Sequence, residues 1–313
     1  MSTFFSGSSS ACASAFGFQE IEQERVSVTA TICTLGYPKT PETGKGYLTI
    51  VGQLNVMAPE IAKSAELLPW EGAAALAFSS QVGALESAIK QIALADEAVS
   101  SAITAQAAAV VQARVRLTKT VSEILVAEMK IATLNAEQRY AESQLIQQET
   151  IGTARIAHAE AIDMLATATT DNTLQLNRLN DVLNNLTVSV GSFNTQELAP
   201  PARGDHQDYV VIVETETLAK INLGEFIRSL QSAINRSSEI LIMVEATHGN
   251  GDISTAFLLG LKKYTTTHEA ILHSIECSLY ECAEILNKAE KSYDTCDASF
   301  TDCDSFIKID NRR

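Results

Sequence analysis

Leu68-Pro69-Trp70-Glu71-Gly72 separates a short apolar run from a much longer one, and Trp70 is the only tryptophan among the 313 residues. A proline ends a helix because it lacks a backbone donor, and a glycine relaxes the backbone that follows it. The large indole ring can fill the junction between two helices. The stretch therefore predicts a turn between two helices, with Trp70 and Gly72 as its bend residues.

Helix-forming residues are abundant in the chain, aromatic residues make up 6%, and no proline occurs between Pro69 and Pro200. That composition favours long helices over strands. After the turn, the larger apolar residues recur at alternating steps of three and four, which is typical of a helix that winds around partner helices. We therefore predict an all-α fold of long antiparallel helical hairpins, packed as a four-helix or coiled-coil-like bundle. The predicted seam consists of Phe78, Val82, Leu85, Ile89, Ile92, Val99, Ile103, Val110, Leu117, Val121 and Ile124.

We divide the chain into four segments. Residues 1–45 are rich in serine and threonine, and the two-residue alternation of residues 26–32 predicts a short strand in a flexible or extended N-terminal segment. Residues 46–190 are the predicted first hairpin, with the Trp-x-Gly bend, and residues 212–313 are the second, which ends in a C-terminal tail. Residues 191–211 hold two adjacent prolines and are the predicted linker.

The helical pattern after the Trp-x-Gly turn is longer than an ordinary globular helix, so we expect a break in it. Thr169-Thr170-Asp171-Asn172 is the predicted position, because these polar residues can cap a new helix. In the last third of the chain, two further apolar seams flank the turn-rich residues 247–252. The second of these seams runs through Phe257, Leu261, Tyr264, Ile271, Ile275, Leu279, Leu286 and Tyr293.

The formal net charge of -15 argues against nucleic acid as a partner, because phosphate binding needs clustered lysine and arginine. Acidity also disfavours adsorption to anionic lipid headgroups, although it leaves the insertion of an apolar helix open. No uninterrupted apolar run approaches the ~18 residues of a transmembrane helix. Residues 1–24 lack the basic residues of a secretory signal peptide, so we expect any export to use another route.

Side chains that could carry catalysis or bind a metal are scattered, and no known motif surrounds them. The histidines lack metal-ligand spacing, and we interpret each as a surface or partner-contacting residue. For the cysteines, free or partly buried thiols and disulfides formed after export are both open. We therefore predict no catalytic residue, no cofactor and no metal site, and expect that the protein is not an enzyme. The histidines are His158, His206, His248, His268 and His273, and the cysteines are Cys12, Cys33, Cys277, Cys282, Cys296 and Cys303.

The residues around the turn carry a resemblance to a known family. Trp70 and Gly72 are followed by small residues and by Phe78, with a helix predicted before them and a seamed helix after them. This arrangement resembles the WxG family of type VII secretion substrates, in which Trp-x-Gly stands at the bend of a helical hairpin. The resemblance covers roughly residues 46 to 120. It implies two hairpins in tandem, of which the second is more divergent because it lacks a tryptophan.

Tyr293 and Asp297 form a candidate export signal. They are similar to the Tyr-x-x-x-Asp/Glu signal that type VII substrates carry after a helical hairpin. Residues four apart lie on one face of a helix, so a phenol and a carboxylate can be presented together to a receptor. Tyr280 and Glu284 have the same spacing, and the alternative is that Tyr293 is an ordinary residue of an amphipathic helix.

With this resemblance, we expect a non-enzymatic helical protein that acts through protein–protein contacts with the secretion machinery or a chaperone. It would be secreted or displayed on the cell surface by a route that needs no signal peptide. One alternative is a cytoplasmic coiled-coil scaffold. Another is an α-helical pore-forming toxin, which the alanine-rich residues 99–126 favour although Arg114, Arg116 and Lys119 interrupt them. Homo-oligomers and membrane contact stay open.

Overall fold

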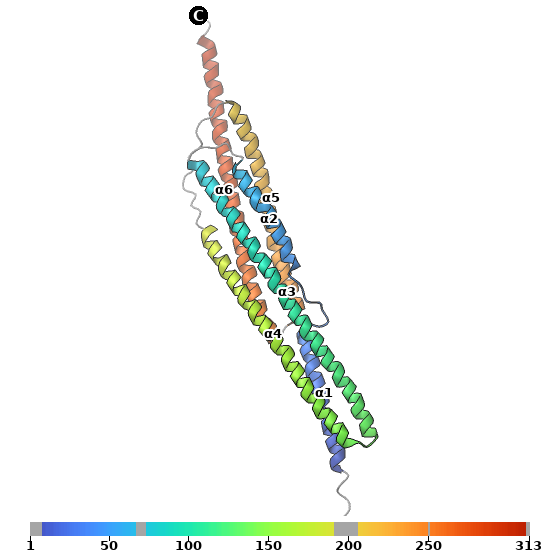
Figure 1. Cartoon of the computed structure of the whole chain (residues 1–313). Helices are drawn as coiled ribbons and strands as arrows, with labels where there is room; N and C mark the ends of the chain where they lie inside the picture. The colour runs from blue at the N-terminus through green and yellow to red at the C-terminus, as the bar shows by residue number, and fades with distance from the viewer. Residues whose placement is uncertain (1–7, 67–72, 191–205, 250, 311–313) are drawn as a thin grey trace, which may run out of the picture. The chain divides into compact units, whose positions relative to one another are not determined.

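The computed structural model describes residues 8–66, 73–190, 206–249 and 251–310, and it describes side chains over 19–63, 76, 78–186, 223–249 and 251–284. Every regular element in these ranges is a helix, which confirms the all-α prediction (Figure 1). The helices are α1 (Ser8–Thr34), α2 (Lys45–Glu66), α3 (Ala73–Ala136), α4 (Tyr140–Val190), α5 (His206–Thr247) and α6 (Asp252–Asp310).

The N-terminal segment forms α1, so the strand predicted at residues 26–32 is wrong. The hydroxyl group of Thr29 donates to the carbonyl oxygen of Arg25 one turn earlier, at 2.7 Å. Such a bond satisfies the polar group of a β-branched residue within the helix itself. Val28 and Ile32, four residues apart, are both buried in one apolar cluster. The alternation thus reflects exposed threonines beside a buried helical face.

The break in the long helical run falls at Gln138, and the break predicted at residues 169–172 is wrong, because α4 passes through that stretch unbroken. Gln138 has a positive φ of 62°. The amide of Arg139 donates to the carbonyl of Leu134 at 2.9 Å, and the amide of Gln138 donates to that of Asn135 at 3.1 Å. These two bonds and the left-handed residue form a Schellman cap, which ends α3 without a glycine or a proline.

α3 and α4 run antiparallel from this turn, as Figure 1 shows. Their paired side chains lie about equally far before and after it. Arg116 pairs with Glu160, and Gln106 donates to Thr169 at 2.9 Å and accepts from Asn172 at 3.0 Å. Thr169 and Asn172, which resemble a helix break in the sequence, are therefore buried and bond to Gln106 across the hairpin.

The chain forms two compact units, each of which combines three separate stretches. Unit 1 comprises Met1–Gly44, Ser101–Asn177 and Ile240–Lys262, and unit 2 comprises Lys45–Ser100, Arg178–Glu239 and Lys263–Arg313. α3, α4, α5 and α6 each contribute residues to both units. The division into four consecutive segments, 1–45, 46–190, 191–211 and 212–313, stays a prediction.

The seam predicted for α3 is buried, except that Val121 is only partly covered. In unit 1, α1 with Leu35 after its end, α3 and α4 contribute the buried residues of two apolar clusters. Removal of such side chains from water is the main favourable term in folding. The first cluster contains Val28, Ile32, Leu35, Ala109, Val110, Ala113, Leu117, Ala161 and Leu165, and the second contains Ile21, Ile124, Ala127, Ile131, Ile151 and Ala154.

Arg114 of α3 is a charged side chain that joins the ends of α1 and α5 in unit 1. Its Nε donates to the carbonyl of Leu35 at 3.0 Å, its Nη1 to that of Lys39 at 2.5 Å and its Nη2 to that of Thr247 at 3.0 Å. Leu35 follows the last residue of α1, and Thr247 is the last residue of α5. Helix C-termini carry unpaired carbonyls and partial negative charge, so a buried cation is well placed there.

Two glycines allow these helix ends to approach. Gly36 has a φ of +86°, and a methyl group on it would lie 2.8 Å from the carbonyl oxygen of Thr247 and 2.9 Å from Nη2 of Arg114. Gly249 has a φ of +87°, and a methyl group there would overlap the carbonyl oxygen of Thr34. Both positions therefore need glycine for its left-handed backbone and for its lack of a side chain.

His248 of unit 1 is fully buried, which corrects its interpretation as a surface or partner-contacting residue. Its ring stacks on Phe257 with centroids 6.1 Å apart, and its Nδ1 lies 3.2 Å from the carbonyl oxygen of Val244. Burial, opposed by that carbonyl and assisted by the charge of Arg114, lowers the pKa of His248 to about 4. The imidazole is therefore neutral at physiological pH.

We predict that Arg114→Met lowers the free energy of unfolding by about 3 kcal/mol, because three carbonyls lose a charged donor in a buried setting. Arg116→Met is the matched control on the same helix, since its ion pair with Glu160 is exposed and is worth less than about 1 kcal/mol. Urea denaturation, monitored by circular dichroism, measures the free energy of unfolding of both variants. Equal losses in the two variants would contradict the role given to Arg114.

We predict that His248 makes the protein acid-sensitive. His248 takes up a proton near pH 6.5 in the unfolded chain and near pH 4 in the folded chain. The free energy of unfolding therefore falls as the pH falls between these values. Between pH 7 and 5 the wild type should lose about 2 kcal/mol more than His248→Gln. The exposed His273 provides the control, because His273→Gln should keep the full loss. The measurement is urea denaturation at each pH, and unchanged pH dependence in His248→Gln would disprove the assignment.

Candidate interaction groove

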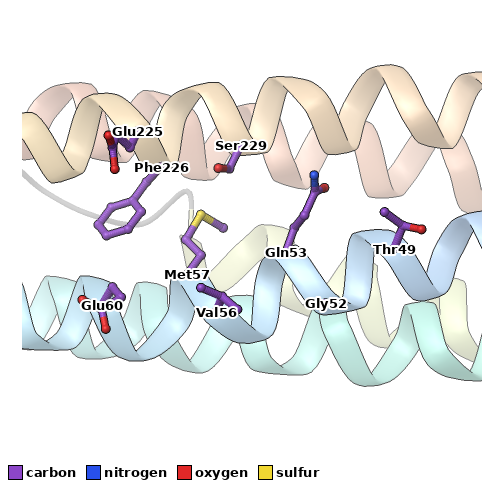
Figure 2. Close-up of a pocket in the computed structure, with 9 residues that line it drawn as sticks. All are labelled: Thr49, Gly52, Gln53, Val56, Met57, Glu60, Glu225, Phe226 and Ser229. Atoms are coloured by element: carbon purple, nitrogen blue, oxygen red, sulfur yellow. The ribbon is translucent and has the colours of Figure 1, made fainter.

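A groove of about 530 Å³ lies between α2 and α5 in unit 2 (Figure 2). Its lining residues recur at three- and four-residue steps, so each helix contributes one face. In Figure 2, Gln53 and Met57 of α2 point toward α5, and Phe226 of α5 points toward α2. The lining consists of Thr49, Gly52, Gln53, Val56, Met57, Glu60, Glu225, Phe226 and Ser229.

The groove combines an apolar floor with charged and exposed edges. Met57 is 3% exposed and Phe226 is 8% exposed, whereas Val56 is 69% exposed. Glu225 brings a carboxylate from α5, and Glu60 brings one from α2 that pairs with Lys63 at 2.5 Å. Such a site suits a partner that inserts an apolar side chain and carries positive charge beside it.

The floor is held in place by the buried face of α2. Its fully or nearly fully covered residues alternate at steps of three and four, which is the seam of an amphipathic helix. Gly52 lies on the adjoining face, and a methyl group on it would have open space around it. The groove is therefore open at Gly52. The buried face consists of Tyr47, Ile50, Leu54, Met57 and Ile61.

A buried polar cluster joins α2, α3 and α6 in the same unit. The Tyr264 hydroxyl donates to Oδ1 of Asp96 at 2.8 Å, and Nε2 of His268 lies 3.0 Å from Oδ2. The Tyr47 hydroxyl lies 3.2 Å from Oγ1 of Thr265, and the ring of Tyr47 meets those of Tyr264 and His268 edge-on at 6.2 Å. Tyr47, Asp96, Tyr264 and His268 have no exposed surface.

Burial dominates the electrostatics of this cluster. It raises the pKa of both Tyr47 and Tyr264, and the negative charge of Asp96 raises them further. Both phenols therefore stay protonated. A protonated phenol can donate to Asp96, which satisfies a carboxylate that would otherwise be costly in an apolar interior.

α6 also bonds to α4 and α5, so it contacts four helices of unit 2. Thr267 donates to Oδ1 of Asn180 at 2.7 Å. Gln231 of α5 donates to Glu276 at 2.7 Å, and Ser238 donates to Glu269. Because α6 holds α2 on one side and α5 on another, these bonds set the distance between the two walls of the groove.

Sequence reasoning missed Asp96 and His268, although a signal for each was present. The predicted seam passes from Ile92 to Val99, and Asp96 fills the missing step. The later seam passes from Tyr264 to Ile271, and His268 fills that step in the same way. His268 was interpreted as a surface or partner-contacting residue, and its complete burial corrects this. A polar residue at a seam position predicts a buried partner on the facing helix.

The side chains of the residues predicted as sites from the sequence lie outside the described part of the chain. Trp70 and Gly72 lie outside the described residues. Tyr293 and Asp297 lie in the helical backbone of α6, and their side chains are outside the described part. Of the competing pair, Tyr280 is 52% exposed and Glu284 is exposed.

The cysteines and the candidate metal ligands of the described residues are as follows. These contain no group of three or more His, Cys, Asp or Glu side chains that could hold a metal ion. Cys33 and Cys277 are exposed free thiols, and Cys282 is a buried one. Burial raises the pKa of the Cys282 thiol to about 12, which makes it unreactive. Among the described helices, none has the length and apolar character needed to cross a membrane.

Comparison with known proteins adds one family to this geometry. Residues 36–119 match the EspA/EspE family. This is a helical family associated with type VII secretion. The match begins at the left-handed Gly36 and covers α2, one wall of the groove, together with the first part of α3. No curated protein and no solved structure matches the chain.

Proposed function

We propose that the chain is a non-enzymatic protein of type VII secretion that is exported without a signal peptide and acts through protein contacts. The observation that carries the proposal is the EspA/EspE match over residues 36–119. That stretch supplies the α2 wall of the groove. A surface for partners therefore coincides with the part of the chain that resembles a secretion-associated family.

The occupant proposed for the groove is a helix of the secretion machinery or its chaperone. Its chemistry follows from the lining, since Met57 and Phe226 favour an inserted apolar side chain. Glu225 favours lysine or arginine one helical turn away from it. A helix with that pattern can lie along α2 and α5.

A non-enzymatic role is supported by the burial of the groups that could do chemistry. Asp96, Tyr264 and His268 bring acid–base groups together in the buried cluster of unit 2, and none has exposed surface. A substrate would have to open the helical packing to reach them. Their bonds to one another and to neighbouring helices favour a role in stability.

We predict that Gly52→Leu reduces export at least about five-fold, because the new side chain occupies the open groove and competes with the partner. Replacement of a helical glycine should otherwise stabilise α2 by roughly 0.5–1 kcal/mol. Gly83→Leu is the matched control, since Gly83 lies in α3 with equally open surroundings. The measurement is the ratio of intact protein in the medium and in cells of the native host. Normal export of Gly52→Leu would rule out the groove as the contact.

We predict that Tyr293→Ala with Asp297→Ala abolishes export while the protein accumulates in cells. Tyr280→Ala with Glu284→Ala has the same spacing and should leave export unchanged. If the second pair blocks export and the first does not, the signal lies at Tyr280. If the wild-type protein itself stays in the cell, the export proposal fails and a cytoplasmic scaffold becomes the better function.

A further inference from the structure

The residues that follow α1 form a strap, which polar contacts hold against the end of α5. We define the strap as residues 35–44, which belong to unit 1 and precede α2. Its start is anchored by Leu35 in an apolar cluster, whereas residues 37–40 are exposed. A segment with few buried apolar contacts opens at a lower free energy than the helices around it.

The bonds between the strap and α5 meet at the last two residues of that helix. The amide of Glu42 donates to Oγ1 of Thr247 at 2.9 Å, and Nζ of Lys39 donates to the carbonyl of Ala246 at 3.3 Å. The guanidinium of Arg114 donates to the carbonyls of both Lys39 and Thr247. A change at the end of α5 therefore acts on the whole strap.

His248 lies directly after this meeting point and has no exposed surface. Its Nδ1 lies 3.2 Å from the carbonyl oxygen of Val244, and because a carbonyl only accepts, Nδ1 carries the hydrogen. Nε2 is then the unprotonated nitrogen, and it is buried with no hydrogen-bond partner in the described part of the chain. A proton added to Nε2 would create a buried charged donor that lacks an acceptor.

The surroundings of His248 also oppose a positive charge. Arg114 of α3 acts on the imidazole with its own positive charge. α6 contributes the ring of Phe257 and the hydroxyl of Ser254, which donates to the carbonyl of His248 at 3.1 Å, and neither side chain is charged. The other titratable side chains in the strap and at the adjoining helix ends are exposed or partly exposed, namely Cys33, Tyr37, Lys39, Glu42, Glu245 and Asp252.

We propose that the strap and the end of α5 form an acid-sensitive latch, which opens when His248 takes up a proton while the helices of unit 1 stay folded. Opening lets water solvate the imidazolium and separates it from Arg114. It also breaks the bonds from the amide of Glu42 to Thr247 and from that of Gly44 to Oγ1 of Thr104. All of these residues belong to unit 1, so the latch does not depend on the groove or on the export proposal.

Hydrogen exchange in the full chain tests the latch at the amides of Glu42 and Gly44, because their acceptors lie on other elements. Protection factors, corrected for the intrinsic effect of pH on exchange, measure how rarely each amide opens. The exposed imidazole has a pKa near 6.5, and burial lowers the pKa in the closed latch to about 4. Protection of both amides should therefore fall about twenty-fold from pH 7 to 5, and less than about two-fold from pH 9 to 7.

Urea shows whether the opening is local. A local opening exposes little surface, so about 1 M urea should leave the protection of Glu42 and Gly44 nearly unchanged. The same urea should lower the protection of the amides of Ala113 and Leu117, in the buried part of α3, at least about ten-fold. An equal urea effect on both sets of amides would overturn the proposal, because the strap would then open only when the unit unfolds.

Two histidine variants assign the pH effect. His248→Gln keeps a neutral polar side chain, so the protection of the strap amides should change less than about two-fold from pH 7 to 5. His273→Gln, at an exposed histidine, should keep the full fall. Circular dichroism shows whether each variant is folded, and if His248→Gln is not, the pH and urea series on the wild type decide. Constant protection in the wild-type strap from pH 7 to 5, or the full fall in His248→Gln, would contradict the latch.

Discussion

The end of α1 and the end of α5 meet in unit 1 because the guanidinium of Arg114 lies between them. Each helix end leaves carbonyl oxygens without partners, and the two sets repel one another when they approach in a medium of low dielectric constant. A planar cation with several donors removes both difficulties, and a lysine could not reach three carbonyls in this way. Gly36 and Gly249 provide the necessary space. The chain path from α1 into the following turn therefore depends on one residue of α3.

Unit 2 uses a different principle, in which polar groups lie inside apolar seams. α6 presents Tyr264 and His268 to α3, Thr265 to α2, and Thr267 to α4. Apolar packing supplies most of the stability of such helices but discriminates poorly between similar arrangements. Hydrogen bonds are directional, so they favour one arrangement of the helices over the others. The groove between α2 and α5 is a consequence, because its two walls are positioned by the same central helix.

The extent to which the sequence predicts the fold varies with the kind of signal. The period of the α3 seam predicted buried residues correctly, because burial of one helical face is a local property. The position of Gln138 could not be predicted in this way, since its left-handed backbone depends on two backbone hydrogen bonds and not on residue type. α1 resembled a strand because threonines alternate beside its buried face. The groove joins Gly52 and Phe226, which are far apart in the chain, and no local pattern connects them.

Asp96 has a consequence for the sliding of helices past one another. In a seam of similar apolar residues, a shift of one heptad replaces each contact with one like it and changes the energy little. A shift of α6 by one heptad in one direction would place Ile271 and Ile275 opposite Asp96, and a shift in the other direction would place Phe257 and Leu261 there. Either slip leaves a buried carboxylate without a donor, at a cost of several kcal/mol. Tyr264 and His268 thus fix the register of α6 against α3.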